Sequence, residues 1–284
     1  LRLDQRGVLS AMGHALMQAS GNRQVVAQGA PAKAVYAAFP NQAGVFGALL
    51  AQRGLSAECS VLEGVAGLFP TAYANRYVPS WLSDGLGERF EMTAVGLKPW
   101  PTTGRAHPYI EAGLDIARTP GFDAAAISEV VIAGAPFIRT FVEPIDVRRQ
   151  PSSPVEAEDS LFYSTAKALC NGAVVLADFQ PAGLAQPEVR ALGPRMRYEV
   201  DPALGTVGVL RVTMTDGATH ERRVKEPLGS PNNPLSDDQL LAKFHDCATH
   251  SLTPIPRARL DRFVDLVWRA DQVDPVSLVR ALHP

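Results

Sequence analysis

The hydrophobic periodicity of this 284-residue chain changes twice, and that double change limits the folds open to it. Residues 8–19 and 41–51 carry apolar side chains at helical spacing, and a helical pattern returns near the C-terminus. Between them, runs rich in β-branched residues alternate with two helical stretches, which indicates an α+β arrangement. The sequence therefore predicts a fold of class α and α+β. Residues 1–88 and 232–284 are expected to be helical, and residues 89–231 to form an α+β domain.

The central segment carries the strand signals. Strands are expected at residues 89–97, 127–135, 140–147, 195–200, 206–215 and 218–225. Helices are expected at 107–118 and 159–172, where the apolar spacing is helical. Asp216 and Gly217 separate the last two runs, and an Asp-Gly pair between two such runs is a strong hairpin signal.

Several residues mark where helices of the outer segments begin or end. Asp4 and Asn41 are candidate N-caps, since Asp and Asn accept hydrogen bonds from free N–H groups of a first helical turn. Gly21 is expected to end the first helix. Ser236 and Gln239 have the spacing of a capping box, which predicts a further helix start.

Composition and charge exclude several classes of protein. The formal net charge is −2 and no basic cluster stands out, which argues against nucleic-acid binding. Apolar runs are too short for a membrane span. Cys59, Cys170 and Cys247 lie far apart, which argues against a disulfide framework and a Cys-rich zinc site and fits a cytoplasmic location. His245 and His250 are five residues apart and would point about 140° apart on a helix, so no metal site is expected.

The stretch Gly96–Pro108 is the most unusual part of the sequence. It lies between an expected strand and an expected helix, prolines stiffen it, and it carries Lys98, Thr103, Arg105 and His107. Cationic side chains beside the N–H groups of a helix N-terminus suit a di- or tricarboxylate. The alternative interpretation is a solvated loop in which His107 caps the helix.

Four segments, in order, carry a resemblance to a known family. They are residues 33–36 with 42–55 and 62–64, residues 98–101 with 107–112, residues 159–172, and residues 232–244. Together they resemble the MmgE/PrpD family, which includes 2-methylcitrate dehydratase and cis-aconitate decarboxylase. The resemblance runs from Leu1 to Pro284. It implies that both chain ends form one helical domain, with the α+β domain inserted as a lid.

The resemblance also implies a site. In the family a pocket lies between the two domains and two lysines reach it, and these match Lys33 and Lys98. Tyr36 stands where family members often have His, and Thr103 where they often have Cys or His, so the exact reaction stays open. The resulting candidates are Lys98 and His107 as catalytic residues, with Lys33, Tyr36, Thr103 and Arg105 as substrate-binding residues.

The function implied is that of a lyase without metal or cofactor, which eliminates water from a hydroxy di- or tricarboxylate. Lysines placed in a dry cleft stabilise the charge of a carbanion next to a carboxylate, while an acid and a base move the protons. Decarboxylation of cis-aconitate and epimerisation of iminodisuccinate use related intermediates and remain alternatives. A non-catalytic module is a third interpretation. We expect a cytoplasmic homodimer that binds neither nucleic acid nor membrane.

The first residue is Leu1 rather than Met, and helical pattern follows almost at once. We therefore expect that an N-terminal helical part of the family, with its Asp, Thr and His residues and the general base, is missing. Without it, the apolar faces of residues 8–19 and 41–51 should lack partners and promote association.

Overall fold

The computed structural model describes residues 1–19, 24–27 and 30–282. The chain divides into two compact units, Leu1–Glu91 and Met92–Pro284. The first unit is helical, and the second combines helices with one four-stranded sheet. This confirms the predicted class, α and α+β. The expected helix end at Gly21 lies outside the described residues.

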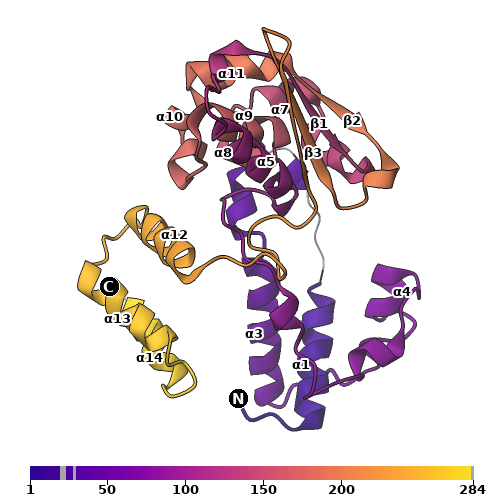
Figure 1. Cartoon of the computed structure of the whole chain (residues 1–284). Coiled ribbons are helices and arrows are strands. Elements are labelled where there is room, and N and C mark those ends of the chain that lie inside the picture. The colour runs from indigo at the N-terminus through magenta and orange to yellow at the C-terminus, as the bar shows by residue number, and fades with distance from the viewer. Residues whose placement is uncertain (20–23, 28–29, 283–284) are drawn as a thin grey trace. The chain divides into compact units, whose positions relative to one another are not determined.

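Two helices lying side by side form the centre of the first unit (Figure 1). Its elements are α1 (Gln5–Met17), α2 (Gln24–Ala27), α3 (Ala38–Gln52), α4 (Leu68–Tyr73) and the 3-10 helices Pro31–Val35 and Pro79–Leu82. The side chain of Asp4 accepts a hydrogen bond from the N–H of Gly7 at 2.8 Å, so the predicted cap of α1 is confirmed. The cap at Asn41 is wrong, because α3 starts at Ala38 and the Asn41 amide donates back to the Ala37 carbonyl.

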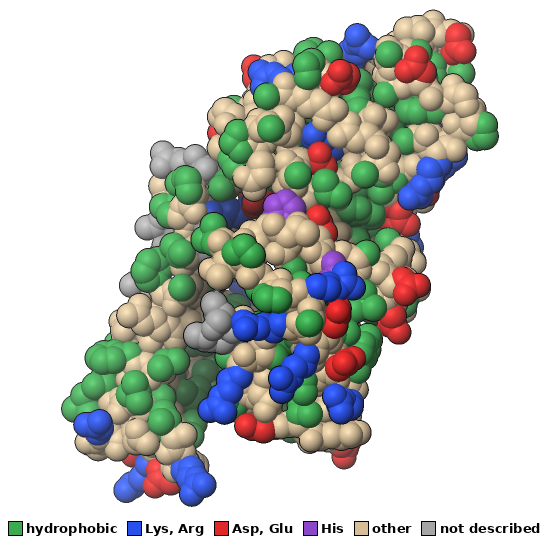
Figure 2. All heavy atoms as spheres, turned by 90° about the vertical axis from the view of Figure 1, so that its left-hand side faces the viewer, with side chains coloured by type: hydrophobic (Ala, Val, Ile, Leu, Met, Phe, Trp, Pro, Cys, Tyr) green, Lys and Arg blue, Asp and Glu red, His purple; other side chains and the backbone are tan. Residues whose placement is uncertain are grey.

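Small residues let α1 and α3 approach closely. Gly47 of α3 is buried, and a Cβ added there would lie 2.8 Å from the carbonyl oxygen of Ala11. The outward faces of the two helices carry exposed apolar side chains, namely Val8, Met12, Met17, Val45, Phe46 and Leu49. Over the face shown in Figure 2, hydrophobic side chains likewise lie among charged ones, singly and in groups.

The sheet of the second unit has the strand order β2-β1-β3-β4. Its strands are β1 (Ile127–Gly134), β2 (Met196–Val200), β3 (Gly208–Met214) and β4 (Thr219–Val224). The β1 and β2 strands are parallel, with Val130 opposite Met196, and the other pairs are antiparallel. The predicted hairpin between β3 and β4 is confirmed, and Gly217 supplies its positive φ of 87°.

Helices cover one face of this sheet (Figure 1). They are α5 (His107–Ala117), α6 (Arg139–Val142), α7 (Ile145–Arg149), α8 (Pro154–Glu158), α9 (Leu161–Asn171), α10 (Pro181–Leu184) and α11 (Pro187–Leu192). Short 3-10 helices join them at Glu91–Ala94, Gly104–Ala106, Ala124–Ala126, Pro136–Ile138, Leu176–Phe179, Gly193–Arg195 and Pro202–Leu204. The predicted helices 107–118 and 159–172 are α5 and α9, and both contribute buried side chains to the core under the sheet.

Two of the expected strands are wrong. Residues 140–147 form parts of α6 and α7 instead. Ile138 and Val142 lie four residues apart and are both fully buried, as expected for one face of a helix. Pro144 then directly precedes α7. Residues 89–97 contain a 3-10 turn at Glu91–Ala94. No strand in the described part of the chain pairs with that segment, so the expected strand has no ladder to join.

Three helices follow the sheet: α12 (Asp237–Thr249), α13 (Arg257–Val267) and α14 (Pro275–Leu282). The capping box at the start of α12 is confirmed, with reciprocal bonds between Ser236 and Gln239. The return of residues 232–284 to the helical domain of residues 1–88 stays a prediction, as do the boundaries of the lid at 89–231. Among the described residues, no helix combines the length and apolar character that crossing a lipid bilayer requires.

Candidate active site

The loop that carries Lys98 is attached to its own unit at both ends. At one end, the Leu97 N–H donates to the carbonyl oxygen of Gly229 at 2.7 Å. At the other, the Thr103 N–H donates to the carbonyl oxygen of Glu158 at 2.9 Å. Gly229 has a φ of 89°, and a Cβ there would overlap the Leu97 carbonyl, so only glycine suits this contact. The loop therefore has a defined position on the α+β core.

Lys98 is exposed, yet its ammonium does not move freely. Its Nζ donates a hydrogen bond to the carbonyl oxygen of Thr102 at 3.0 Å. Thr102 is itself buried, and its hydroxyl donates to the carbonyl of Thr103 at 3.2 Å. Because an ammonium has three N–H donors, one bond to the loop leaves two for an anion. The arrangement suits a cation that is held ready to meet a carboxylate.

His107 begins α5 and is almost fully buried, with 4% of its surface exposed. Its ring lies edge-on to Trp100, with centroids 5.4 Å apart, and it hydrogen-bonds the Trp100 backbone. Its Nε2 has no hydrogen-bond partner in the described part of the chain. Burial first, then the positive charge of Lys98, lowers the pKa of this imidazole to about 4, so the ring is neutral at pH 7. A catalytic role for His107 stays a prediction, and it requires that Trp100 uncover the ring.

Arg105 and Thr103 occupy the turn between Lys98 and His107. Arg105 is exposed, and its guanidinium lies 4.6 Å from the centroid of the Phe137 ring. This cation–π contact uses the face of the guanidinium and leaves N–H donors at its edge. Thr103 is half-buried and directly precedes the short 3-10 helix Gly104–Ala106, without a capping hydrogen bond from its side chain. A role for either side chain in anion binding stays a prediction.

Lys33 and Tyr36 belong to the first unit. Lys33 is half-buried in the 3-10 helix Pro31–Val35, and Tyr36 is the residue that ends it, with half of its surface exposed. These two residues lie on one turn. Lys98, Thr103, Arg105 and His107 lie along one loop and the helix start that follows it, with Lys98 close enough to His107 to affect its pKa. A common cleft that joins Lys33 and Lys98 stays a prediction.

A buried ion pair was not foreseen from the sequence. Lys167 of α9 is 1% exposed, and its Nζ lies 3.0 Å from Oδ1 of Asp178 and 2.7 Å from Oε1 of Gln186. The other carboxylate oxygen of Asp178 accepts the N–H of Val175 at 2.8 Å. A lysine inside the apolar run of α9 was the available signal, but the sequence does not reveal its partner. Among the described residues, no group of three or more His, Cys, Asp or Glu side chains is arranged to hold a metal ion.

Comparison with known proteins decides the family. The model of the MmgE/PrpD C-terminal domain matches residues 100–269, and that of the MmgE/PrpD N-terminal domain matches residues 1–78. The first match alone covers more than half of the chain. The chain belongs to the MmgE/PrpD family. Lys33 lies within the N-terminal match and His107 within the C-terminal one, while Lys98 falls in the short stretch between the two.

The curated relatives of this MmgE/PrpD chain described next are named as cis-aconitate decarboxylases or as similar to them. A cis-aconitate decarboxylase-like protein of Aspergillus oryzae is 27% identical, covering 96% of this chain and 59% of its own length. The human cis-aconitate decarboxylase is also 27% identical, covering 74% of this chain and 44% of its own length. The matches thus span about half the length of these relatives. They support a family of dehydratase and decarboxylase type without deciding the reaction.

Proposed function

We propose that this chain forms part of a metal-independent lyase of 2-methylcitrate dehydratase type, which eliminates water from a hydroxy di- or tricarboxylate. The observation that carries the proposal is the exposed Lys98 ammonium, held by the Thr102 carbonyl on an anchored loop in a member of this family. A small carboxylate-rich substrate needs such a cation. We further propose a cytoplasmic homodimer.

The chemistry assigns a role to each candidate. Removal of a proton next to a carboxylate places extra negative charge on that carboxylate, and a preorganised cation stabilises it. We assign Lys98 to this stabilisation or to proton transfer, and Lys33 to binding a second carboxylate. Thr103, Arg105 and Tyr36 are assigned to further contacts with the substrate.

Unlike the exposed cation Lys98, His107 is buried and neutral, which limits its role in this scheme. Its neutral imidazole can accept a proton at Nε2 only if substrate reaches the ring, since the ring is buried behind Trp100. Its hydrogen bond to the Trp100 backbone also holds the loop next to Lys98. His107 therefore supports the site by position as well as being a candidate proton carrier.

Decarboxylation is the second candidate, and one observation favours it: the curated relatives are named cis-aconitate decarboxylases or decarboxylase-like. Loss of CO₂ from a tricarboxylate also leaves a carbanion that a cation stabilises. The same roles of Lys98 and Lys33 therefore serve both reactions.

The test is a substrate panel followed by ¹H NMR. The protein is expressed from the complete reading frame of its gene and incubated, with a chelator present, with 2-methylcitrate, cis-aconitate and iminodisuccinate separately. The proposal expects dehydration of 2-methylcitrate, and loss of CO₂ from cis-aconitate identifies the second candidate. Epimerisation of iminodisuccinate alone, turnover of none of the three, or activity restored only by one added metal overturns the proposed reaction.

A further inference from the structure

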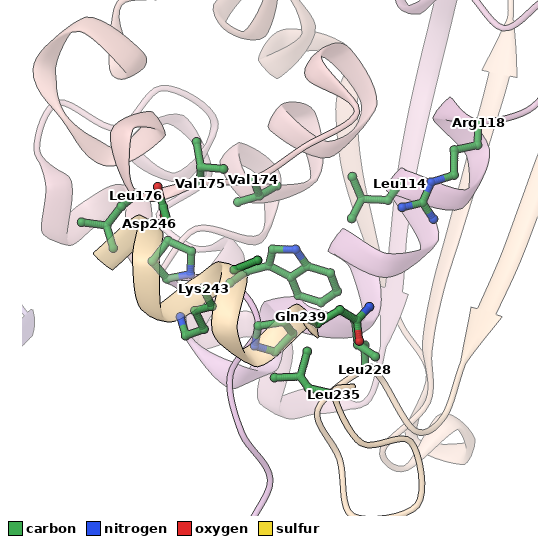
Figure 3. Close-up of a pocket in the computed structure, with 14 residues that line it drawn as sticks. Leu114, Arg118, Val174, Val175, Leu176, Leu228, Leu235, Gln239, Lys243 and Asp246 are labelled. Atoms are coloured by element: carbon green, nitrogen blue, oxygen red, sulfur yellow. The ribbon is translucent and has the colours of Figure 1, made fainter. Parts of the chain in front are cut away.

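A cavity of about 430 Å³ lies within the second unit, next to the loop that carries Lys98 (Figure 3). One side is formed by α5 and the segment after α9, and the other by α12. Apolar walls come from Trp100, Leu114 and Val174. The volume is within the range of pockets that hold small ligands.

Hydrogen bonds and an ion pair of Asp178 fix the segment of Val174 and Val175 that forms one wall of the cavity. Asp178 accepts the Val175 N–H at 2.8 Å, and the same carboxylate pairs with the buried ammonium of Lys167 at 3.0 Å. Since Lys167 is 1% exposed, water does not screen this pair. The apolar wall is therefore preformed, and a ligand would lose little free energy in ordering it.

Helix α12 presents polar groups to the cavity at helical spacing. Gln239, Lys243 and Asp246 all line it, and Figure 3 shows them on this one helix. The side-chain oxygen Oε1 of Gln239 already accepts the Ser236 N–H, so the side-chain NH₂ of Gln239 is left as a donor. Lys243 is half-buried and forms no ion pair with any carboxylate of the described chain. The cavity thus combines apolar walls with two donor side chains one helical turn apart, and the ammonium of Lys243 is the charged one.

The remaining charges limit how many anionic groups fit. Arg118 also lines the cavity, but its guanidinium pairs with Asp115 at 3.2 Å. Asp246 lies on the Lys243 side and would repel a second carboxylate. Lys243 is thus the cation of the lining that has no ion-pair partner among the described residues, and with Asp246 nearby the lining suits one negative head group at most.

We propose that this cavity binds a monocarboxylate with an apolar body. The carboxylate lies on Lys243, and the apolar body lies against Trp100, Leu114 and Val174. This goes beyond the proposed function, whose substrate carries two or three carboxylates. A second carboxylate would meet Asp246, so the two ligand classes differ in charge.

Trp100 makes the cavity observable. Trp81 and Trp268 are 75% and 56% exposed, and neither lines the cavity. In a background where Trp81, Trp268 and any tryptophan that the complete reading frame encodes outside these 284 residues are replaced by Phe, Trp100 is the sole tryptophan, and its fluorescence reports on the cavity. The probe is hexanoate, and hexanamide is its neutral counterpart.

Three variants in that background separate charge from shape. Lys243→Met keeps the length of the side chain and removes the cation, while Lys225→Met removes an exposed lysine outside the cavity. Ala242→Phe places a ring in the cavity, which Ala242 lines. Circular dichroism checks that each variant is folded.

The expected result is a saturable change of Trp100 fluorescence with hexanoate and a much weaker response to hexanamide. Lys243→Met should weaken hexanoate binding by about 10-fold or more, since a hydrogen bond to a charged group is lost. Lys225→Met should leave the affinity unchanged, and folded Ala242→Phe should abolish binding. The proposal is overturned if hexanoate causes no saturable change, if hexanamide binds equally well, or if Lys243→Met binds as the parent does.

Discussion

The ammonium of Lys98 and the carbonyl oxygen of Thr102 are joined by a hydrogen bond of 3.0 Å across one short loop. The loop is attached to the core on both sides, at Gly229 and at Glu158. The position of the charge is thus set by backbone contacts, since Lys98 forms no ion pair with a carboxylate of the described residues. A cation held in this way keeps its full charge for a substrate.

The contact between Leu97 and Gly229 leads to a stability prediction. Replacing Gly229 by Ala adds a Cβ at a φ of 89° and also overlaps the Leu97 carbonyl. The positive φ alone costs about 1–2 kcal/mol, and the overlap adds to it. Urea denaturation should therefore show a clear loss of stability.

Gly217→Ala is the matched control for this change. Gly217 has a φ of 87°, but nothing lies within 4 Å of an added Cβ. It should show the loss from φ alone, and so a smaller one. Equal losses for the two variants would mean that the Gly229 contact does not hold the loop.

His107 leads to a prediction about pH. Its pKa is lowered to about 4, so below about pH 6.5 the unfolded chain binds a proton that the folded protein does not. The free energy of unfolding should therefore fall as the pH drops from about 6.5 to 4, by up to about 3 kcal/mol from this residue.

NMR titration of the His107 ring measures this directly, with a midpoint expected near pH 4. His107→Gln should flatten this part of the stability profile relative to the parent protein. A ring that titrates near its ordinary value of 6.5 would show that the imidazole is open to solvent.

The buried pair of Lys167 and Asp178 leads to a third prediction. Lys167→Met leaves the Asp178 carboxylate buried without its cation, which should reduce the free energy of unfolding by about 3–5 kcal/mol. Adding Asp178→Asn removes the stranded charge while keeping an acceptor for the Val175 N–H, so the double variant should recover part of the loss.

An exposed ion pair provides the comparison. Arg118 and Asp115 lie 3.2 Å apart with side chains 70% and 46% exposed. Arg118→Gln should change stability by less than about 1 kcal/mol. If Lys167→Met lowered the free energy of unfolding by as little as Arg118→Gln, the buried pair would not stabilise the segment at Val175.

Much of the fold could be predicted from local patterns. The α5 and α9 helices, the β3–β4 hairpin at Asp216 and Gly217, and the Ser236 capping box follow from side-chain spacing and backbone preference, which act over a few residues. Residues 140–147 show where this fails. There, burial of Val142 on a helical face outweighs the preference of β-branched residues for strands.

The site was predictable to a smaller extent. Prolines and cations mark the loop of Lys98 and His107, but the Thr102 carbonyl that holds Lys98 is a backbone atom with no sequence signature. Burial of His107 behind Trp100 likewise depends on packing. Lys167 and Asp178 meet because α9 and the following turn pack together, and periodicity carries no information about that contact.

The most direct test of the account is the turnover number of Lys98→Met, measured in the complete enzyme on whichever substrate the panel identifies. Loss of one preorganised donor to a developing charge should lower kcat about 10²–10³-fold. The thermal midpoint should stay close to that of the parent, because Lys98 is exposed. Lys225→Met, at another exposed lysine, should retain normal turnover. Near-normal kcat in folded Lys98→Met would contradict the assignment of Lys98 to the reaction.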